Sequence, residues 1–119
     1  MGFTRLQFTI AHPIDLDRSA EVDLLVDTGA LNSVVPQEIL VDLGIPRQFR
    51  RVFRLANGQT IERDAGVAFF RWNGHMSAAP VVFAEPGDEA LLGVTALEAM
   101  GLRVDPIKRV LEPTDSLLL

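Results

Sequence analysis

The sequence lacks cysteine and tyrosine altogether, and it has only two histidines in 119 residues. Without cysteine the chain can form no disulfide, zinc-thiolate site, iron–sulfur cluster or thiol nucleophile. The two histidines, His12 and His75, lie far apart in the sequence, so no short-spaced histidine pair for a metal is present. We therefore expect neither a metal site nor a cofactor.

An excess of positive charge and long hydrophobic runs are also missing. Lys and Arg total 11 against 16 Asp and Glu, which gives a formal net charge of −5. Nucleic-acid partners usually require a basic patch, so none is expected. No stretch approaches the ~18–20 apolar residues of a membrane span, and the N-terminus Met1–Arg5 lacks the pattern of a signal peptide. We expect no membrane partner and a cytoplasmic location.

What is present is ordinary globular composition, with 48% hydrophobic and 23% charged residues. The length suits one domain, 1–119, and no linker or low-complexity segment interrupts it. Apolar residues alternate with polar ones over 5–10, which predicts a half-buried strand, and again from 22, which predicts a second strand that becomes buried on both faces near Asp27. The pattern predicts an all-β chain with further strands at 50–56, from 60 onward, and at 67–72, 76–83, 102–104 and 107–111, and short helices at 37–43 and 94–100.

Two Asn-Gly pairs, Asn57-Gly58 and Asn73-Gly74, predict hairpin turns in which both turn residues have positive φ. The chain also shows a faint internal echo. A strand, a sharp turn, a short helix and a terminal glycine occur once up to Gly44 and again up to Gly101. This echo suggests a structural duplication, although chance similarity is an equal alternative.

The residue most suggestive of chemistry is Asp27, at the end of the apolar strand Val22–Val26. An isolated carboxylate at the end of a buried strand pays a desolvation cost. One interpretation is a turn aspartate that caps neighbouring backbone amides. The other is an aspartate held in a rigid loop for acid–base work.

The segment Leu25-Val26-Asp27-Thr28-Gly29-Ala30, followed downstream by Leu91-Leu92-Gly93 and a short helix, resembles the retropepsin-like (retroviral-type) aspartic proteases, in a bacterial-type single-domain form. The resemblance covers roughly residues 22–111. It implies a closed acid-protease-like β-barrel with one or two short helices and one lobe per chain.

The resemblance also implies an endopeptidase that uses two aspartates and one water. The chain has a single Asp-Thr-Gly, so a symmetric homodimer would place Asp27 of each subunit at the two-fold axis. Two adjacent carboxylates share one proton. The ionised one takes a proton from water, and the protonated one polarises the scissile carbonyl of an extended peptide.

The same resemblance suggests roles for neighbouring residues. Thr28 would bond across the dimer, the Gly29 carbonyl would accept a substrate amide, and Ala30 would keep the floor of the site small. Leu92 and Gly93 would support that floor without chemistry of their own. The flap that covers the cleft would be the hairpin tip formed by Leu55, Ala56, Asn57, Gly58, Gln59 and Thr60.

The chain departs from the family pattern in places. Its flap has no tyrosine, and apolar Val94 follows Gly93 where relatives often carry a polar residue. The strand Phe3–Ile10 and the end Leu117–Leu119 could interlace in a dimer, or the end could be disordered. Two rival functions stay open: a non-catalytic peptide-binding module on the same fold, and a different β-barrel in which Asp27 only caps a turn.

Overall fold

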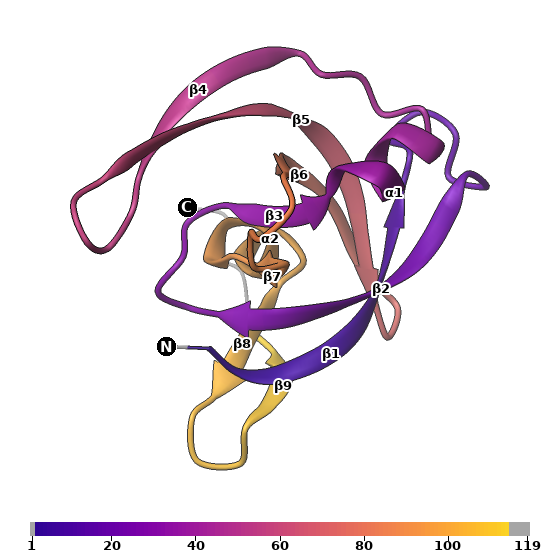
Figure 1. The fold of residues 1–119 in the computed structure, drawn as a ribbon. Coiled ribbons are helices and arrows are strands. Elements are labelled where there is room, and N and C mark those ends of the chain that lie inside the picture. The colour runs from indigo at the N-terminus through magenta and orange to yellow at the C-terminus, as the bar shows by residue number, and fades with distance from the viewer. Residues whose placement is uncertain (1, 115–119) are drawn as a thin grey trace, which may run out of the picture.

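The computed structural model describes residues 2–114. Nine strands and two short helices follow one another within this range (Figure 1). In chain order they are β1 (Gly2–Ala11), β2 (Ser19–Asp27), β3 (Ser33–Pro36), α1 (Gln37–Asp42), β4 (Phe49–Arg54), β5 (Thr60–Trp72), β6 (His75–Ala84), β7 (Leu91–Leu92), α2 (Val94–Ala99), β8 (Leu102–Asp105) and β9 (Val110–Pro113). The prediction of a mostly β chain with short helices is confirmed.

Seven strands form one strongly curled sheet in the order β1-β2-β7-β3-β6-β5-β4, and β8 and β9 form a separate pair. The curl brings β1 against β5 as well, but over only three register pairs, from Thr9 opposite Arg71 to Ala11 opposite Phe69. Strand β4 lies outside this curl, pairs only with β5 and keeps an open edge. The expectation of a closed barrel is therefore wrong: β4 is extended away from the curl to form a hairpin with β5.

Strand β5 is a single element, where the sequence suggested two. Its first half, from Thr60 to Ala65, pairs with β4, and its second half, from Ala65 to Trp72, pairs with β6. The backbone of the segment before β4 approaches closely here, because a Cβ at Gly66 would lie 2.5 Å from the carbonyl oxygen of Pro46. One long strand thus belongs to both the projecting hairpin and the core sheet.

Some predicted boundaries shift for local reasons. The helix predicted over 37–43 ends one residue earlier, at Asp42, and Pro36 before it ends β3. The predicted strand 107–111 begins later, because Asp105 Oδ1 accepts bonds from the amides of Ile107 (2.9 Å) and Lys108 (3.0 Å) and makes a turn there. The end Leu117–Leu119 lies outside the described residues.

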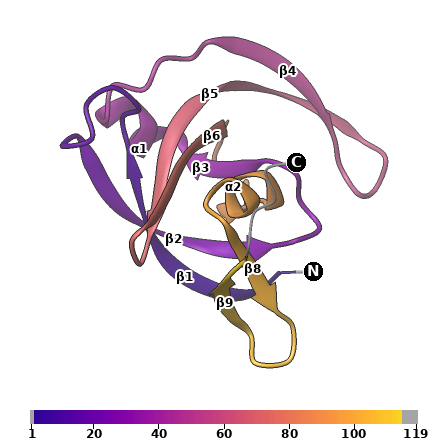
Figure 2. The same ribbon diagram turned by 180° about the vertical axis from the view of Figure 1, so that it is seen from behind.

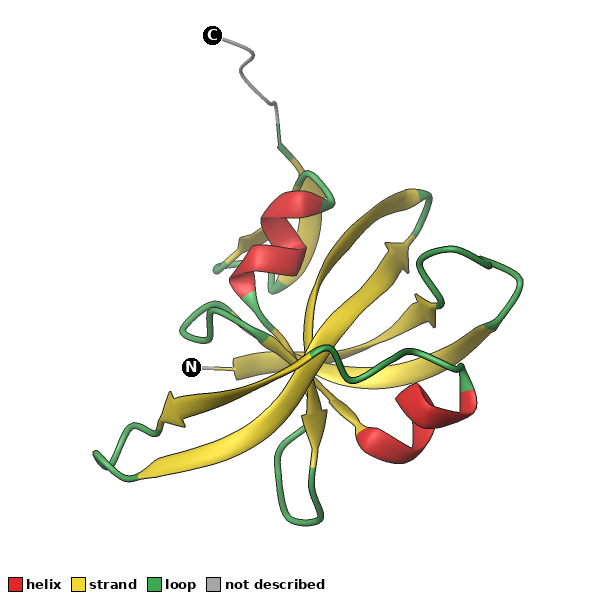
Figure 3. Ribbon diagram, turned by 90° about the horizontal axis from the view of Figure 1, so that it is seen from above, coloured by secondary structure: helices red, strands yellow, loops and turns green. Residues whose placement is uncertain are grey.

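The core fills the inside of the curl. The fully buried large side chains are Phe8, Ile10, Leu24, Val35, Leu40, Phe70, Val81, Phe83, Leu92 and Leu102. The two helices lie on different sides of the sheet (Figure 3) and end alike. In both, the glycine after the helix, Gly44 or Gly101, has a φ near 75° (76° and 75°) and its amide donates to a carbonyl three residues earlier. This likeness matches the internal echo of the sequence.

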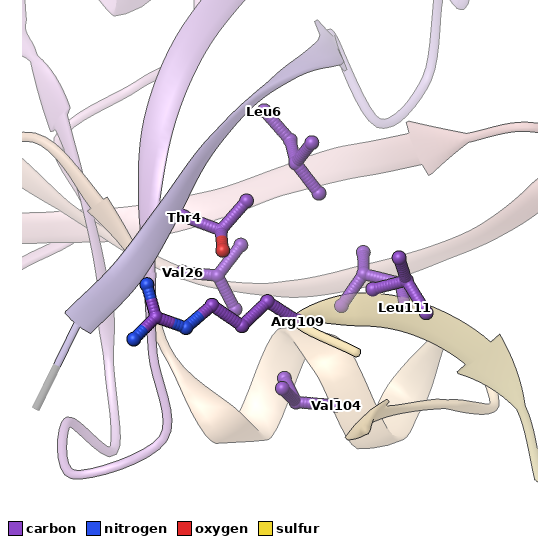
Figure 4. A pocket seen from close by; sticks show the side chains of 7 residues that line it. Thr4, Leu6, Val26, Val104, Arg109 and Leu111 are labelled. Carbon is purple, nitrogen blue, oxygen red and sulfur yellow. The ribbon is translucent and has the colours of Figure 1, made fainter. Parts of the chain in front are cut away.

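The β8–β9 hairpin projects below β1 and β2 (Figure 2). Where it packs against them it leaves a cavity of about 10 Å³ (Figure 4), lined by Thr4, Leu6, Val26, Val104, Arg109, Val110 and Leu111. Such a volume holds about one water molecule. This cavity is therefore a small packing defect that is too small to bind a substrate.

Candidate active site

A cleft of about 490 Å³ lies between the loop that follows β2 and the β4–β5 hairpin. In Figure 1 that loop and the tip of the hairpin open on the same side of the molecule. The cleft is lined by Asp27, Gly29, Ala30, Leu31, Asn32 and Val34 on one side, by Phe53, Arg54, Leu55, Ala56, Ile61 and Arg63 from the hairpin, and by Val82, Asp88, Glu89 and Leu91. Three distant parts of the chain therefore build one groove.

Asp27 ends β2 and is half-buried at the wall of this cleft. Its Oδ1 accepts a hydrogen bond from the amide of Gly29 (2.9 Å), and its carbonyl accepts one from the amide of Ala30 (3.1 Å). The capping bond predicted for a turn aspartate is thus present. A carboxylate accepts several hydrogen bonds, so a capping bond and a chemical role are compatible.

The residues next to Asp27 differ in position. Gly29 and Ala30 line the cleft, whereas Thr28 is exposed and is not part of its lining. The loop therefore presents a small-residue floor to the cleft and directs its threonine elsewhere.

The floor rests on the start of α2. The amides of Val94 and Thr95 donate to the carbonyls of Ala30 (2.8 Å) and Leu31 (3.2 Å). In the sequence, apolar Val94 stands where relatives of the resembled family often carry a polar residue. The backbone makes the connection instead, so the nature of the Val94 side chain does not matter for these bonds.

Gly93 fits between these parts with no room for a side chain. A Cβ there would lie 2.6 Å from the carbonyl oxygen of Asn32. Its amide donates to the hydroxyl of Ser33 (3.0 Å), a side chain that is only 1% exposed. Sequence reasoning missed Ser33, although a lone hydroxyl beside Val34 and Val35 was a signal of a buried polar group that needs a partner.

Leu92 is fully buried beneath the loop. Strand β7 runs parallel to β2, with Leu91 opposite Leu25 and Leu92 opposite Val26, and Leu91 also pairs with Val34 of β3. The two strands that flank the Asp27 loop are therefore joined through β7.

The hairpin predicted as a flap only partly contacts the cleft. Leu55 and Ala56 line it, while Asn57, Gly58, Gln59 and Thr60 do not and are exposed. The turn also differs from the expected geometry, because only Gly58 has a positive φ (88°). Bonds from Gly58 N to Leu55 O (3.0 Å) and from Leu55 N to Gln59 O (2.7 Å) make a wider turn with a glycine bulge. Both residues of Asn73-Gly74 do have positive φ, as predicted.

The charged residues of the cleft lining include an ion pair that sequence reasoning missed. Arg63 binds Asp88 through two parallel bonds, Nε to Oδ2 (2.7 Å) and Nη2 to Oδ1 (2.9 Å). The bond from Arg63 lowers the pKa of Asp88 below its ordinary value, against the opposing effect of burial. The same bond raises the pKa of Arg63. Both groups are therefore charged over the ordinary pH range.

Two further kinds of site are not found in the part of the chain that the structure describes. No group of three or more His, Asp or Glu side chains there could hold a metal ion. Within residues 2–114, no helix has the length and apolar character needed to cross a membrane.

Comparison with known proteins agrees with this geometry. A scan against protein-family models matches residues 13–96, more than half of the chain, to a family described as aspartyl protease. The match includes Asp27, the hairpin, Leu92 and Gly93. A search of curated proteins found no match. With its Asp-Thr-Gly loop at the wall of a cleft that is also lined by hairpin residues, the chain belongs to this aspartyl protease family of the retropepsin-like clan.

Proposed function

We propose that the protein is a homodimeric aspartic endopeptidase in which Asp27 of each subunit supplies one of the two catalytic carboxylates. The observation that carries the proposal is the cleft itself, which joins Asp27, the small floor residues Gly29 and Ala30, and the hairpin residues Leu55 and Ala56. Family membership makes peptide-bond hydrolysis the expected chemistry.

The need for a second subunit follows from the composition. Two-aspartate hydrolysis requires two carboxylates in contact, and the sequence contains one Asp-Thr-Gly. A two-fold axis at the mouth of the cleft would bring the partner's copy of the loop against the first. Thr28, exposed beside Asp27, would then face its counterpart across the axis.

In the dimer, the two carboxylates share one proton, because like charges in contact disfavour double ionisation. The ionised member removes a proton from the attacking water, and the protonated member donates to the carbonyl oxygen of the scissile bond. The hydrogen bond from Gly29 N to Asp27 Oδ1 fixes the carboxylate plane for this exchange.

The substrate would be an extended peptide with apolar side chains near the scissile bond. The cleft presents Val34, Phe53, Ile61, Val82 and Leu91, which offer apolar subsites. An extended strand alternates its side chains between two faces, so alternate residues of the peptide would enter pockets on the floor and under the hairpin.

The test is cleavage of a broad peptide library by the purified protein at mildly acidic to neutral pH, with Asp27→Asn as the inactive variant. This change keeps an oxygen for the Gly29 amide, so the fold should persist and circular dichroism should be unchanged. We expect the variant to lose at least ~10³-fold in kcat. Equal cleavage by both proteins would refute catalysis by Asp27.

Subunit mixing tests the shared site. Wild type refolded with an equal amount of Asp27→Asn should retain about a quarter of its activity per total protein if both carboxylates are needed, because only about a quarter of random dimers carry two intact copies. Retention of half would indicate an independent site in each chain. If the wild type binds library peptides but cuts none, the protein is a binding module.

A further inference from the structure

The Arg63–Asp88 pair joins two parts of the cleft that are separate in the sequence. Arg63 lies on β5, two residues from Ile61, and its side chain is 14% exposed. Asp88 lies in the loop before β7, and its side chain is 21% exposed. A two-bond contact between arginine and carboxylate fixes both distance and orientation, so it determines where this loop lies relative to the hairpin.

Asp88 is also bound to its own loop. Its Oδ2 accepts from the amide of Glu85 (2.8 Å), and its amide donates to the carbonyl of Glu85 (3.0 Å). Arg63 Nη1 lies 3.6 Å from Glu85 Oε1. The arginine therefore binds a preformed acidic turn rather than one freely moving side chain.

From this turn the connection continues to the catalytic loop. The carbonyl of Ala90 accepts from the amide of Leu25 on β2 (3.2 Å), and Leu91 pairs with both Leu25 and Val34. Within a few residues, the chain thus passes from the contact with Arg63 to the two strands that flank Asp27.

The hairpin needs this partner for an electrostatic reason. In the β4–β5 register, Arg51 stands directly opposite Arg63. Like charges opposite each other destabilise a strand pair. Asp88 neutralises one of the two arginines, so the pairing that holds the hairpin over the cleft depends on the loop before β7.

We propose that Arg63 and Asp88 are positioning residues that set the height of the β4–β5 hairpin above the catalytic floor and so preform the peptide groove. This inference rests on the proposed function. Neither residue is assigned a chemical step. Their loss should therefore weaken substrate binding and leave the rate of bond cleavage in the bound complex nearly unchanged.

The chain offers a matched control in the next residue. Asp64 also binds arginine, with Arg47 Nη1 at 2.8 Å and Arg50 Nη1 at 3.0 Å, and these bonds also lower its pKa. It is not part of the cleft lining. Asp64→Asn thus removes two ion pairs from the same hairpin without touching the groove.

The experiment measures kcat and KM for the library peptide cleaved fastest by the wild type. Asp88→Asn and Arg63→Met should raise KM about tenfold, since the groove must then be ordered by the substrate, with kcat within about twofold. Arg63→Lys keeps the positive charge but cannot make two parallel bonds to Asp88, so its KM should lie between those of Arg63→Met and the wild type. Asp64→Asn should leave KM within about twofold.

Hydrogen exchange of segment 85–91 in the free protein supplies a readout that needs no activity. Exchange should be faster in Asp88→Asn than in the wild type and in Asp64→Asn, because the turn loses its anchor. An unchanged KM in Asp88→Asn, or exchange equal to that of Asp64→Asn, would overturn the inference. A wild type that cleaves no peptide would instead refute the proposed function. The hydrogen-exchange comparison would still test whether the Arg63–Asp88 pair holds segment 85–91 in place.

Discussion

Ser33 and Gly93 show how single residues hold the Asp27 loop in place. The Ser33 hydroxyl is buried and accepts the Gly93 amide, and the absence of a side chain at Gly93 lets α2 begin against the carbonyl of Asn32. A buried amide that loses its acceptor pays the full cost of desolvation. The floor beneath Asp27 is therefore sensitive to changes that leave Asp27 itself intact.

We expect Ser33→Ala to lower the free energy of unfolding by about 1–3 kcal/mol, because the Gly93 amide would be left buried without an acceptor. Urea unfolding at pH 7 measures this change. Ser19→Ala, at an exposed position of β2, is the control and should cost less than about 0.5 kcal/mol. Equal losses for the two variants would show that the Ser33–Gly93 bond does not stabilise the fold.

At the scale of elements, the β4–β5 hairpin differs from the β5–β6 hairpin although both contain Asn-Gly. The first has a wider turn with positive φ only at Gly58, and the second has positive φ at both Asn73 and Gly74. The Asn57 side chain accepts the amide of Gln59 (2.9 Å) in the first turn. The dipeptide thus indicates a hairpin but does not specify which turn closes it.

The two glycines allow a controlled test of the flap. Gly58 has φ 88° and Gly74 has φ 86°, and an added Cβ would meet nothing within 4 Å at either position. Alanine should therefore cost each hairpin about 1 kcal/mol through backbone strain alone. Only Gly58→Ala should also change KM or kcat of peptide cleavage, because Leu55 and Ala56 of its hairpin line the cleft. Equal kinetics for both variants would argue against the flap role.

At the scale of the whole molecule, specific ion pairs engage part of the excess of acidic side chains. With a net charge of −5, the chain uses arginines of the β4–β5 hairpin to bind Asp64 and Asp88. The pKa of each of these carboxyl groups lies below its ordinary value. Such groups stabilise the fold above the pKa of an unfolded aspartate, and this contribution is lost as the pH falls through their folded pKa.

We expect the free energy of unfolding to change little between about pH 7 and 5 and to fall below about pH 4, near the pKa of an unfolded aspartate. Asp88→Asn should lose less stability between pH 5 and 3 than the wild type, because it has no carboxylate to protonate at this site. The exposed pair at Asp64 should contribute less, owing to solvent screening. Urea unfolding at pH 7, 5 and 3 provides the comparison. If Asp88→Asn and the wild type lose the same free energy of unfolding between pH 5 and 3, the Arg63–Asp88 pair does not stabilise the fold.

Features that depend on neighbours in the chain were predictable. The alternation around Phe8 and Leu24, the helices ending at Gly44 and Gly101, and the capped loop at Asp27 all arise from short-range periodicity and local hydrogen bonds. The resemblance of the Asp27 and Leu92 segments to the aspartyl proteases is confirmed by the family match.

What the sequence by itself determined is therefore most of the elements, the capped loop at Asp27 and the family. Only the tertiary structure decided that β5 changes partner at Ala65, that β4 stays outside the curl, that Ser33 binds Gly93 across 60 positions, and that Arg63 binds Asp88 across 25. The physical reason is that periodicity reports which face of an element is buried. It carries no information on which distant polar group will meet another once the sheet has curled.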